Sequence, residues 1–520
     1  LMSTIILCMT ACLAGCAKTK EQQEEPPQLE IEPIEPEEQE EEPVVEEEPE
    51  EDYLFKHRET LYLWYADEGL TDYLNGVAVS YNEYQDEVRV IPVHTPGMEY
   101  LETINQASLQ GEEVPDLYIV SNDSLEKAYL AGLASEVKLP EGVQSMEEML
   151  PGTAVRAVTY HDKQIGYPFY YETSCLLYNR TYLEEWAKAQ IITERDQALA
   201  EDAQEQADSG EVEEEIQEAH EEQEVSDEEI EAKIEEAIPE TIDEILSFAD
   251  VYDAPEHVEA VFKWDVSDIF YNYFIVGNYI DVGGVNGDNA ASIGIYNENA
   301  IKALRVYQNL NQFFSIDTKE ISYDGVLQDF LDGKIVYTVA TTDALSILEK
   351  ARDEGTFSYE YGTTRVPDVS EELASASLSV TQCVGVNGYS TKKDMANDFA
   401  VYLTQYNTQE LYARTGKLPV HCDGDTYDDP NAAAFLEEYA RSVPMPKMIE
   451  TSNFWVQLEI AFARIWEGAD ANDELKALSE QIMGQVLGEA YTEEYIDVPI
   501  PVEESEEEGE EGETEGQETE

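Results

Sequence analysis

A regular alternation of short apolar runs with segments of helical spacing is the feature of this sequence that most constrains its fold. Residues 61–66 form a strand-like run, and apolar residues from Leu70 to Tyr81 then recur at helical spacing. The same pair of patterns follows around Val90, and again from 117–120 onward. Three such units in succession predict a parallel sheet with right-handed connections and helices packed on its faces.

The alternation resumes further along the chain. Residues 174–179 form another strand-like run, residues 241–244 carry a capping box that starts a helix, and residues 335–340 are apolar enough for a buried strand. Residues 53–187 and 238–500 together suit two lobes joined by more than one crossing of the chain. The expected fold class is α/β.

Three segments carry about half of the net charge of −86, which comes from 115 acidic and 29 basic residues. Residues 17–52 predict a self-repelling Glu/Pro tether, residues 188–237 a solvated low-complexity insertion, and residues 501–520 a disordered tail. A partner-binding arm is the alternative for the insertion. A nucleic-acid partner is excluded, because such binding depends on neutralising phosphates with basic side chains.

Residues 1–16 form one apolar run that is too short to span a bilayer and indicates a signal peptide. The run ends in Leu-Ala-Gly-Cys, which resembles the lipobox of bacterial lipoproteins. The resemblance implies that Cys16 becomes the mature N-terminus and carries a diacylglyceryl anchor with fatty acyl chains such as palmitate. The expected location is therefore the extracytoplasmic face of a bacterial cell membrane. No basic residue precedes the run and the chain begins with Leu1, so we expect a truncated start.

Three cysteines remain after Cys16, namely Cys175, Cys383 and Cys422. Three thiols cannot all pair, and one disulfide stays open as an alternative. Cys175 and Cys383 lie in apolar strand-like runs, where we expect buried, reduced side chains that act as small hydrophobic groups.

Motifs for catalysis are missing from the sequence. The chain has no HExxH, GxSxG, GxxxxGK or GxGxxG pattern. We therefore assign no metal and no cofactor, and we expect a binding protein rather than an enzyme. A glycosidase would need two carboxylates at a set separation, which the sequence alone does not reveal, so an extracellular hydrolase remains the third alternative.

Seven segments carry a resemblance to a known family through their order and spacing. They are LYLWYADEGL (61–70), VPDLYIVSNDSLEKAYLAGLASEV (114–137), KQIGYPFYYETSCLLYNR (163–180), TIDEIL (241–246), FLDGKIVYTVAT (330–341), the stretch from TQCVGVNGYS to TGKLPV (381–420), and MPKMIETSNFWVQLEIAFARIWEG (445–468). Together they resemble the extracellular solute-binding proteins of ABC importers, the family that contains maltose-binding protein.

The resemblance implies a periplasmic-binding-protein fold, in which two discontinuous lobes close on a ligand about hinge strands. The hinge would pass through Tyr171–Ser174 and near Cys383. The implied lobes are an N-lobe of 53–171 plus 383–425 and a C-lobe of 174–380 plus 430–500, with the insertion 188–237 in the C-lobe.

The implied function is capture of a sugar or oligosaccharide and its delivery to the permease subunits of an ABC transporter, by a chain expected to be monomeric. The alternatives are a surface sensor of the same fold, and uptake of an amino sugar or polyamine.

Site residues carry over where the family's motifs match. Asp123 falls where relatives use an acid to bind sugar hydroxyls, although it could be only a helix N-cap. Glu172 matches a cleft carboxylate beside a hinge strand, and Trp455 matches a tryptophan that stacks on a sugar ring. Tyr170 and Tyr171 are further candidates for ring stacking.

Three more acids complete the implied site. Asp67 follows the first predicted strand and would face the mouth of the cleft. Asp343 lies where relatives often carry GPW, and Glu459 replaces a family arginine, so the maltodextrin platform is altered. The resulting acceptors suit many hydroxyl groups or a cation.

Overall fold

The computed structural model describes residues 58–111, 114–209, 225–406, 408–421 and 427–499. All of them belong to one compact unit, His57–Glu520. The predicted signal peptide, the anchor at Cys16, the whole tether 17–52, Cys422 and the acidic tail lie outside the described residues.

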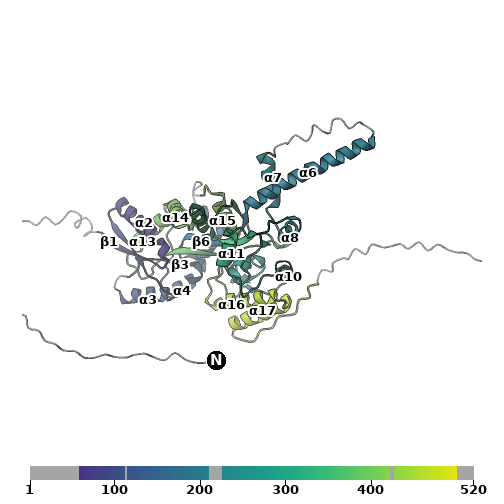
Figure 1. The fold of residues 1–520 in the computed structure, drawn as a ribbon. Coiled ribbons are helices and arrows are strands. Elements are labelled where there is room, and N and C mark those ends of the chain that lie inside the picture. Colours follow the sequence, from purple (N-terminus) through teal and green to yellow (C-terminus); the bar gives the residue numbers. More distant parts are fainter. Residues whose placement is uncertain (1–57, 112–113, 210–224, 407, 422–426, 500–520) are drawn as a thin grey trace, which may run out of the picture. The chain divides into compact units, whose positions relative to one another are not determined.

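The first part of the fold alternates strands and helices as the sequence predicts (Figure 1). β1 pairs in parallel with both β2 and β3. Leu61, Leu63 and Tyr65 of β1 point into the core, because every second side chain of a strand faces the same side. The elements are β1 (Glu59–Tyr65), α2 (Thr71–Tyr84), β2 (Val88–His94), α3 (Tyr100–Gln110), β3 (Leu117–Ser121) and α4 (Leu125–Leu130).

One sheet with the strand order β2-β1-β3-β12-β6-β10-β7 runs through the fold. It is mixed rather than parallel throughout, because β12 is antiparallel to both β3 and β6. β11 and β13 also pair with β6, and β14 pairs with β12. These strands are β6 (Tyr167–Asn179), β7 (Ala260–Phe262), β10 (Ile335–Thr341), β11 (Tyr361–Thr364), β12 (Leu378–Val386), β13 (Leu418–Pro419) and β14 (Val443–Pro444); two further small sheets are β4 (Thr159–Tyr160) with β5 (Lys163–Gln164) and β8 (Asp281–Val282) with β9 (Ile293–Gly294).

The strand β6 changes partners along its length. Its first part, up to Thr173, pairs with β12, and from Ser174 onward it pairs with β10. β12 has a register shift between Gln382 and Cys383, where its pairing with β6 is irregular. The hinge predicted for Tyr171–Ser174 and for the region near Cys383 therefore coincides with two interruptions of regular pairing. Its movement remains a prediction.

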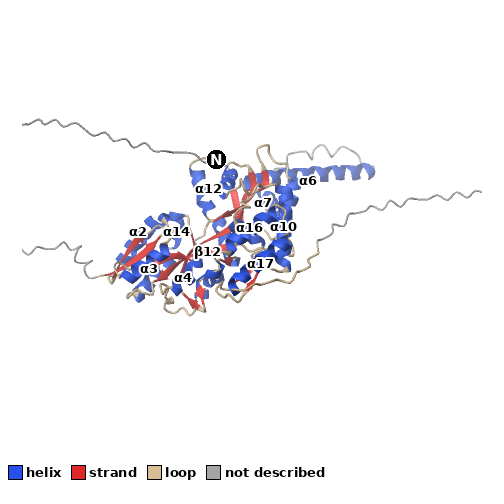
Figure 2. Cartoon of the chain, turned by 90° about the horizontal axis from the view of Figure 1, so that it is seen from below, coloured by secondary structure: helices blue, strands red, loops and turns tan. Residues whose placement is uncertain are grey.

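Helices cover both parts of the sheet (Figure 2). Two clusters of buried apolar side chains form the core. In the second cluster, Trp264 and Trp466 meet edge to face with ring centroids 5.6 Å apart. The remaining α-helices are α5 (Gly152–Val158), α8 (Ile242–Val251), α9 (Ile269–Asn272), α10 (Glu298–Phe314), α11 (Tyr323–Leu331), α12 (Asp343–Asp353), α13 (Lys393–Val401), α14 (Thr408–Thr415), α15 (Pro430–Arg441), α16 (Phe454–Trp466) and α17 (Ala471–Leu487), besides α6 and α7 below.

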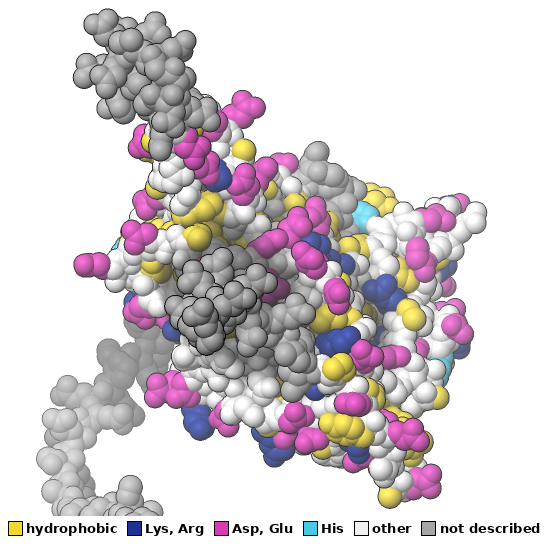
Figure 3. Space-filling view, turned by 90° about the vertical axis from the view of Figure 1, so that its right-hand side faces the viewer, with side chains coloured by type: hydrophobic (Ala, Val, Ile, Leu, Met, Phe, Trp, Pro, Cys, Tyr) yellow, Lys and Arg dark blue, Asp and Glu magenta, His cyan; other side chains and the backbone are white. Residues whose placement is uncertain are grey.

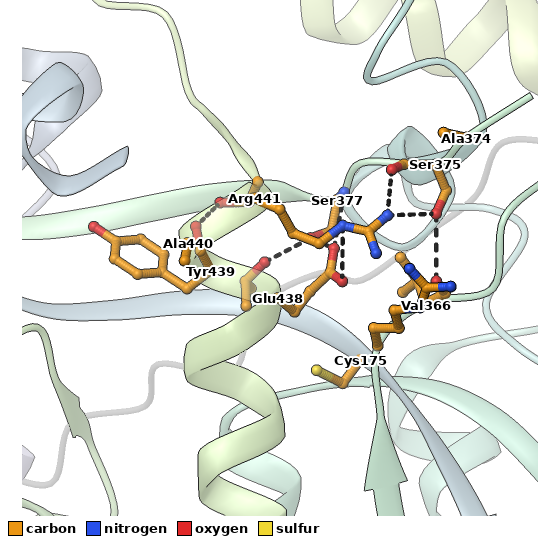
Figure 4. A network of polar contacts seen from close by, with 12 residues as sticks. Cys175, Val366, Ala374, Ser375, Ser377, Glu438, Tyr439, Ala440 and Arg441 are labelled. Atoms are coloured by element: carbon orange, nitrogen blue, oxygen red, sulfur yellow. Dashed lines mark hydrogen bonds and ion pairs between the residues drawn. The ribbon is translucent and has the colours of Figure 1, made fainter. Parts of the chain in front are cut away.

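A buried polar network ties α15 to the start of β12 (Figure 4). The Glu438 carboxylate accepts hydrogen bonds from the Ser377 hydroxyl at 2.6 Å and from its amide at 3.2 Å. Arg441 donates to the Ser375 carbonyl at 2.5 Å and lies 3.7 Å from Glu438. Ser377 also contacts the Thr173 hydroxyl of β6 at 2.9 Å. The network therefore fixes both long strands next to the predicted hinge.

The acidic insertion begins and ends in helices. α6 (Arg180–Ser209) and α7 (Asp227–Ala237) lie side by side (Figure 1). Ile191 on α6 and Ile230 and Ile234 on α7 are buried in the second core cluster. The expectation of a solvated excursion is therefore wrong for these two ends. Ile230 and Ile234 share one face of a helix that a capping box at Ser226 stabilises, and this face packs on the core.

The expectation for two cysteines is confirmed. Cys175 and Cys383 are buried and free, and burial raises the pKa of both thiols. Among the described helices, none combines the length and apolar character needed to cross a membrane.

Candidate acidic and aromatic ligand site

The first group of site residues gathers where β1 ends and β6 passes. Asp67 follows β1 and caps a short helical turn by accepting a hydrogen bond from the Gly69 amide at 2.9 Å. Its carboxylate also pairs with the Lys417 ammonium at 2.6 Å. Lys417 precedes β13 and lies 4.9 Å from the ring centroid of Tyr170, within cation–π range. Lys417 thus links Asp67 to the β6 strand.

Side-chain alternation on β6 decides which of its predicted residues can reach this group. Tyr170 and Glu172 are two residues apart and point to one face, whereas Tyr171 points to the other. The Tyr171 ring is fully buried and stacks on Tyr439 of α15, with centroids 4.1 Å apart and an angle of 17° between the planes. In this conformation Tyr171 belongs to the core and offers no surface to a ligand.

Glu172 lies on the exposed face of β6. Its side chain is reached by solvent, and the surrounding protein atoms raise the pKa of its carboxyl, with partial burial as the largest cause. Lys417 opposes the rise of the pKa, and the charges of Asp343 and Asp67 reinforce it. The charges of Lys417, Asp343 and Asp67 therefore all act on the Glu172 carboxyl of β6.

The ion pair with Lys417 keeps Asp67 charged. Burial tends to raise the pKa of this carboxyl, but the hydrogen bond and charge of Lys417 and the Gly69 amide together bring it below its ordinary value. The pKa of Asp67 is thus lowered and that of Glu172 is raised in similar surroundings, because Asp67 contacts the Lys417 ammonium group directly.

Asp343 extends the site to the other side of β6. It is the first residue of α12 and accepts a hydrogen bond from the Tyr323 hydroxyl at 2.8 Å. The Tyr271 ring stacks on Tyr323, with centroids 4.6 Å apart and an interplanar angle of 15°. Burial raises the pKa of Tyr271, and the charges of Asp343 and Asp268 add to the rise. Two aromatic rings therefore lie between these acids.

The helix α16 supplies the next pair of predicted residues. Trp455 and Glu459 are four residues apart and share a helix face. The pKa of Glu459 is raised by burial and then by the charge of Asp268, which caps α9 through the Phe270 amide at 2.8 Å. Trp455 is half-buried and meets Tyr273 edge to face at 5.4 Å. Glu459 thus adds a further acid to the site, and Trp455 places an indole ring on the same helix face.

Asp123 and Trp455 line one recess of about 420 Å³, together with Ser124, Lys447 and Met448 among others. Asp123 accepts hydrogen bonds from the hydroxyls of Ser121 and Ser124. Neither the short turn at Asn122–Ser124 nor α4 receives a side-chain cap bond, so Asp123 is not acting as an N-cap. Its exposed carboxylate faces the recess instead.

The structure thus places six of the eight predicted residues along a row of acids and rings, which we call the acidic row, and leaves both Tyr170, which is 3% exposed, and Tyr171 in the core. Sequence reasoning missed Lys417, Tyr271, Tyr323 and Asp268 as members of the row. Asp268 had a usable signal, because it lies shortly after the apolar residues of 261–264, as Asp67 lies after the strand-like run 61–66. Tyr323 had no such signal, because it is the first residue of α11 and the whole helix separates it from the strand β10.

The chemistry of the row is that of binding. Carboxylates accept hydrogen bonds from hydroxyl or ammonium groups, and the rings offer flat apolar faces. In the part of the chain that the structure describes, no three or more His, Cys, Asp or Glu side chains converge to hold a metal ion.

Comparisons with known proteins identify the family and the fold. The sequence profile of a family described as bacterial extracellular solute-binding protein matches residues 77–423. No curated protein matches the chain in sequence.

Solved structures share the fold at low sequence identity. A solute-binding protein from Staphylococcus aureus in complex with maltose is 18% identical, with a TM-score of 0.63 over 82% of this chain and 98% of its own. A maltose-binding periplasmic protein from Listeria monocytogenes in complex with maltose is 19% identical, with a TM-score of 0.63 over 84% and 100%. A maltotriose-binding protein from Thermus thermophilus is 20% identical, with a TM-score of 0.54 over 82% and 98%. These chains show the two-lobed fold.

Proposed function

Because this chain belongs to the bacterial extracellular solute-binding proteins, we propose that it captures a small solute between its two lobes and delivers it to the permease subunits of an ABC transporter. The observation that carries the proposal is the row of carboxylates and aromatic rings, to which residues from both sides of β6 contribute. A surface sensor of the same fold would use the same capture step and differ only in the partner that reads the closed state.

A sugar or oligosaccharide is the ligand that suits the row best. Vicinal hydroxyls can donate to Glu172, Asp67, Asp343 and Asp123, and the indole of Trp455 can pack against the apolar face of a sugar ring. Sugars are also the ligands of the three solved structures named above.

Capture would proceed by closure about β6 and β12. In the open form Glu172 stays exposed to solvent, and closure would bring Trp455 and Glu459 against a ligand already hydrogen-bonded to Glu172. A ligand that contacts both lobes favours the closed state by its additional contacts in that state. No bond is made or broken, so the proposed role is binding and not catalysis.

A cationic solute, such as an amino sugar or a polyamine, is the second candidate. It is favoured by the excess of acids in the row, where Asp67, Glu172, Asp343, Asp268 and Glu459 are accompanied by Lys417. An ammonium group of the ligand would neutralise part of this excess negative charge.

The proposed place of action is the outer face of a bacterial cell membrane, where an acyl anchor at Cys16 would hold the chain and the acidic tether would keep the lobes away from the lipid. We propose that the chain acts there as a monomer. The family's extracellular role supports this location.

Isothermal titration with maltotetraose, glucosamine and spermidine tests the proposal. Glu172→Gln keeps the shape of the side chain but removes its charge, and should weaken binding of the accepted ligand at least about fivefold, since a charged acceptor contributes roughly 1 kcal/mol or more. Glu298→Gln is the matched control, because Glu298 pairs with Lys302 on α10 away from the row. Equal affinities of the two variants would refute the assignment of the site.

A further inference from the structure

A large groove lies on the N-lobe, and the proposed function makes no use of it. Its volume is about 1040 Å³. The walls come from the end of α2, the start of β2, residues 138–141, α13 and the π-helical turn η5 (Tyr402–Tyr406). A π-helix is rare and often marks a functional site, so the position of η5 at the groove is notable.

Four tyrosines form a ladder of rings in the groove. Tyr84 stacks on Tyr402 with centroids 5.9 Å apart and an interplanar angle of 26°. Tyr81 lies beside Tyr84 at 6.4 Å, and Tyr406 continues the ladder 6.3 Å from Tyr402. Tyr84 is 76% exposed and Tyr406 is 69% exposed. Tyr84 and Tyr406, which both contact the Tyr402 ring, are therefore open to solvent, whereas Tyr81 is buried beneath them. Exposed apolar surface that is gathered in one place often marks a binding site.

The groove lies at the opposite end of the N-lobe sheet from the acidic row. Val88, a lining residue, is the first residue of β2 and is paired with Glu59 at the start of β1. Asp67 and Asp123 instead follow the ends of β1 and β3. Seven residues of β1 separate the two ends, which corresponds to roughly 20 Å at the rise of an extended strand. A ligand in the groove is therefore separate from one in the row.

Polar groups surround the ladder. Glu87, Glu141 and Asp398 line the groove, and Lys138, also in the lining, pairs with Asp394 at 3.2 Å. Acidic side chains are spread over the surface generally, as Figure 3 shows for one face of the molecule. Their presence here reflects the composition of the chain, whereas the tyrosine ladder is a local feature of the groove.

We propose that the groove is a second carbohydrate site, which holds a segment of a neutral polysaccharide chain outside the cleft. The faces of successive sugar rings would pack on the tyrosine ladder, and the three carboxylates would accept hydrogen bonds from sugar hydroxyls. The volume is at the upper end of the range for small-ligand sites and more than twice that of the recess beside Trp455, so it suits several sugar units in a row.

Native gel electrophoresis in gels that contain amylopectin, lichenan or hydroxyethyl cellulose tests the proposal. The wild-type chain should be retarded by at least one of these neutral glucans. The double variant Tyr84→Ala/Tyr406→Ala should lose retardation, with a dissociation constant raised about tenfold or more, because it removes both exposed aromatic rings on which the sugar would pack. Both side chains are exposed, so the variant should fold normally.

Two controls separate this site from others. Tyr495→Ala removes a tyrosine that is 62% exposed but outside the groove, and it should be retarded like the wild type. Glu172→Gln, in the acidic row, should also be retarded normally. If the glucan site is real but the proposed solute capture is wrong, Glu172→Gln will not change ligand affinity in titration, and the double variant will still lose its retardation in the gels.

Three results would overturn the proposal. One is the absence of retardation of the wild type in all three gels, and another is equal retardation of the wild type and the double variant. The third is sedimentation of the wild type as a dimer that the double variant dissociates, because the ladder would then be an interface between copies of this chain.

Discussion

Replacing Lys417 with methionine tests the electrostatic description of the site. Methionine keeps an unbranched side chain of similar length but removes the charge. The ion pair with Asp67 at 2.6 Å is half-exposed and contributes about 0.5–1 kcal/mol, and the cation–π contact with Tyr170 at 4.9 Å contributes a similar amount. The variant should therefore lose about 1–2 kcal/mol of unfolding free energy.

The same change should alter the pH dependence of ligand binding. Lys417 holds down the pKa of Glu172, whereas burial and the charges of Asp343 and Asp67 raise it. Without the ammonium group the pKa of Glu172 rises further. Binding that needs an ionised Glu172 is lost as the pH falls through this pKa, so in Lys417→Met the loss should begin at a higher pH than in the wild type.

Denaturant unfolding and titrations between pH 4 and pH 8 measure the two effects. Lys302→Met is the matched control, since it removes the same charge from an exposed pair with Glu298 on α10. The reasoning is refuted if Lys417→Met behaves like Lys302→Met in both measurements. A loss of stability without a change in the pH profile would refute the coupling to Glu172 alone.

Three other predictions concern the fold around the site. Lys447 is buried, and burial is the main cause that lowers its pKa to about 8, so the free energy of unfolding should increase as the pH rises from about 8 toward the ordinary pKa of lysine. In Lys447→Met, the increase measured by denaturant unfolding between pH 8 and pH 10 should be about 2 kcal/mol smaller than in the wild type. An unchanged increase would contradict this account. Gly277→Ala would place a methyl group 2.0 Å from a backbone oxygen just before β12 and should lower the free energy of unfolding by at least about 3 kcal/mol. In the control Gly294→Ala the new methyl group lies 3.8 Å from its neighbour, so this change should be tolerated. Similar melting temperatures for the two variants would contradict the close packing at Gly277. Ile234→Ala in α7 should lower the free energy of unfolding by about 2–4 kcal/mol. The Ile192 side chain is 51% exposed, so Ile192→Ala should lower it by less than about 0.5 kcal/mol. Equal values in urea unfolding would show that α7 is not part of the core.

Much of the fold follows from local patterns in the sequence. The first three βα units, the strand β10 and the capping box before α8 are visible as apolar runs, helical spacing and cap residues, and the structure has them where the patterns place them. These elements are specified by residues close together in the chain, which is why sequence reasoning finds them.

The insertion shows where this reasoning fails. Charge dominates its composition and predicts a solvated segment, yet Ile230 and Ile234 anchor α7 in the core. Two apolar residues at helical spacing outweigh several acids on the solvent side of the helix, because only the packed face decides burial.

The site was predictable only where it follows strand ends or family motifs. Glu172 and Tyr170 could be placed on one strand face, but the burial of Tyr171 depends on Tyr439, which is far away in the sequence. Lys417 reaches Asp67 through the pairing of β13 with β6, and no local pattern signals that contact. Long-range pairing thus decides which charges meet.

Hydrogen–deuterium exchange with and without the ligand accepted in titration tests the central claim most directly, because it reports where the solute is held. Capture between the lobes predicts slower exchange at the same time in residues 66–70 and 170–173, in residues 415–419, and in residues 454–459. Protection limited to one of these segments, or saturation with ligand without protection in any of them, would contradict the account.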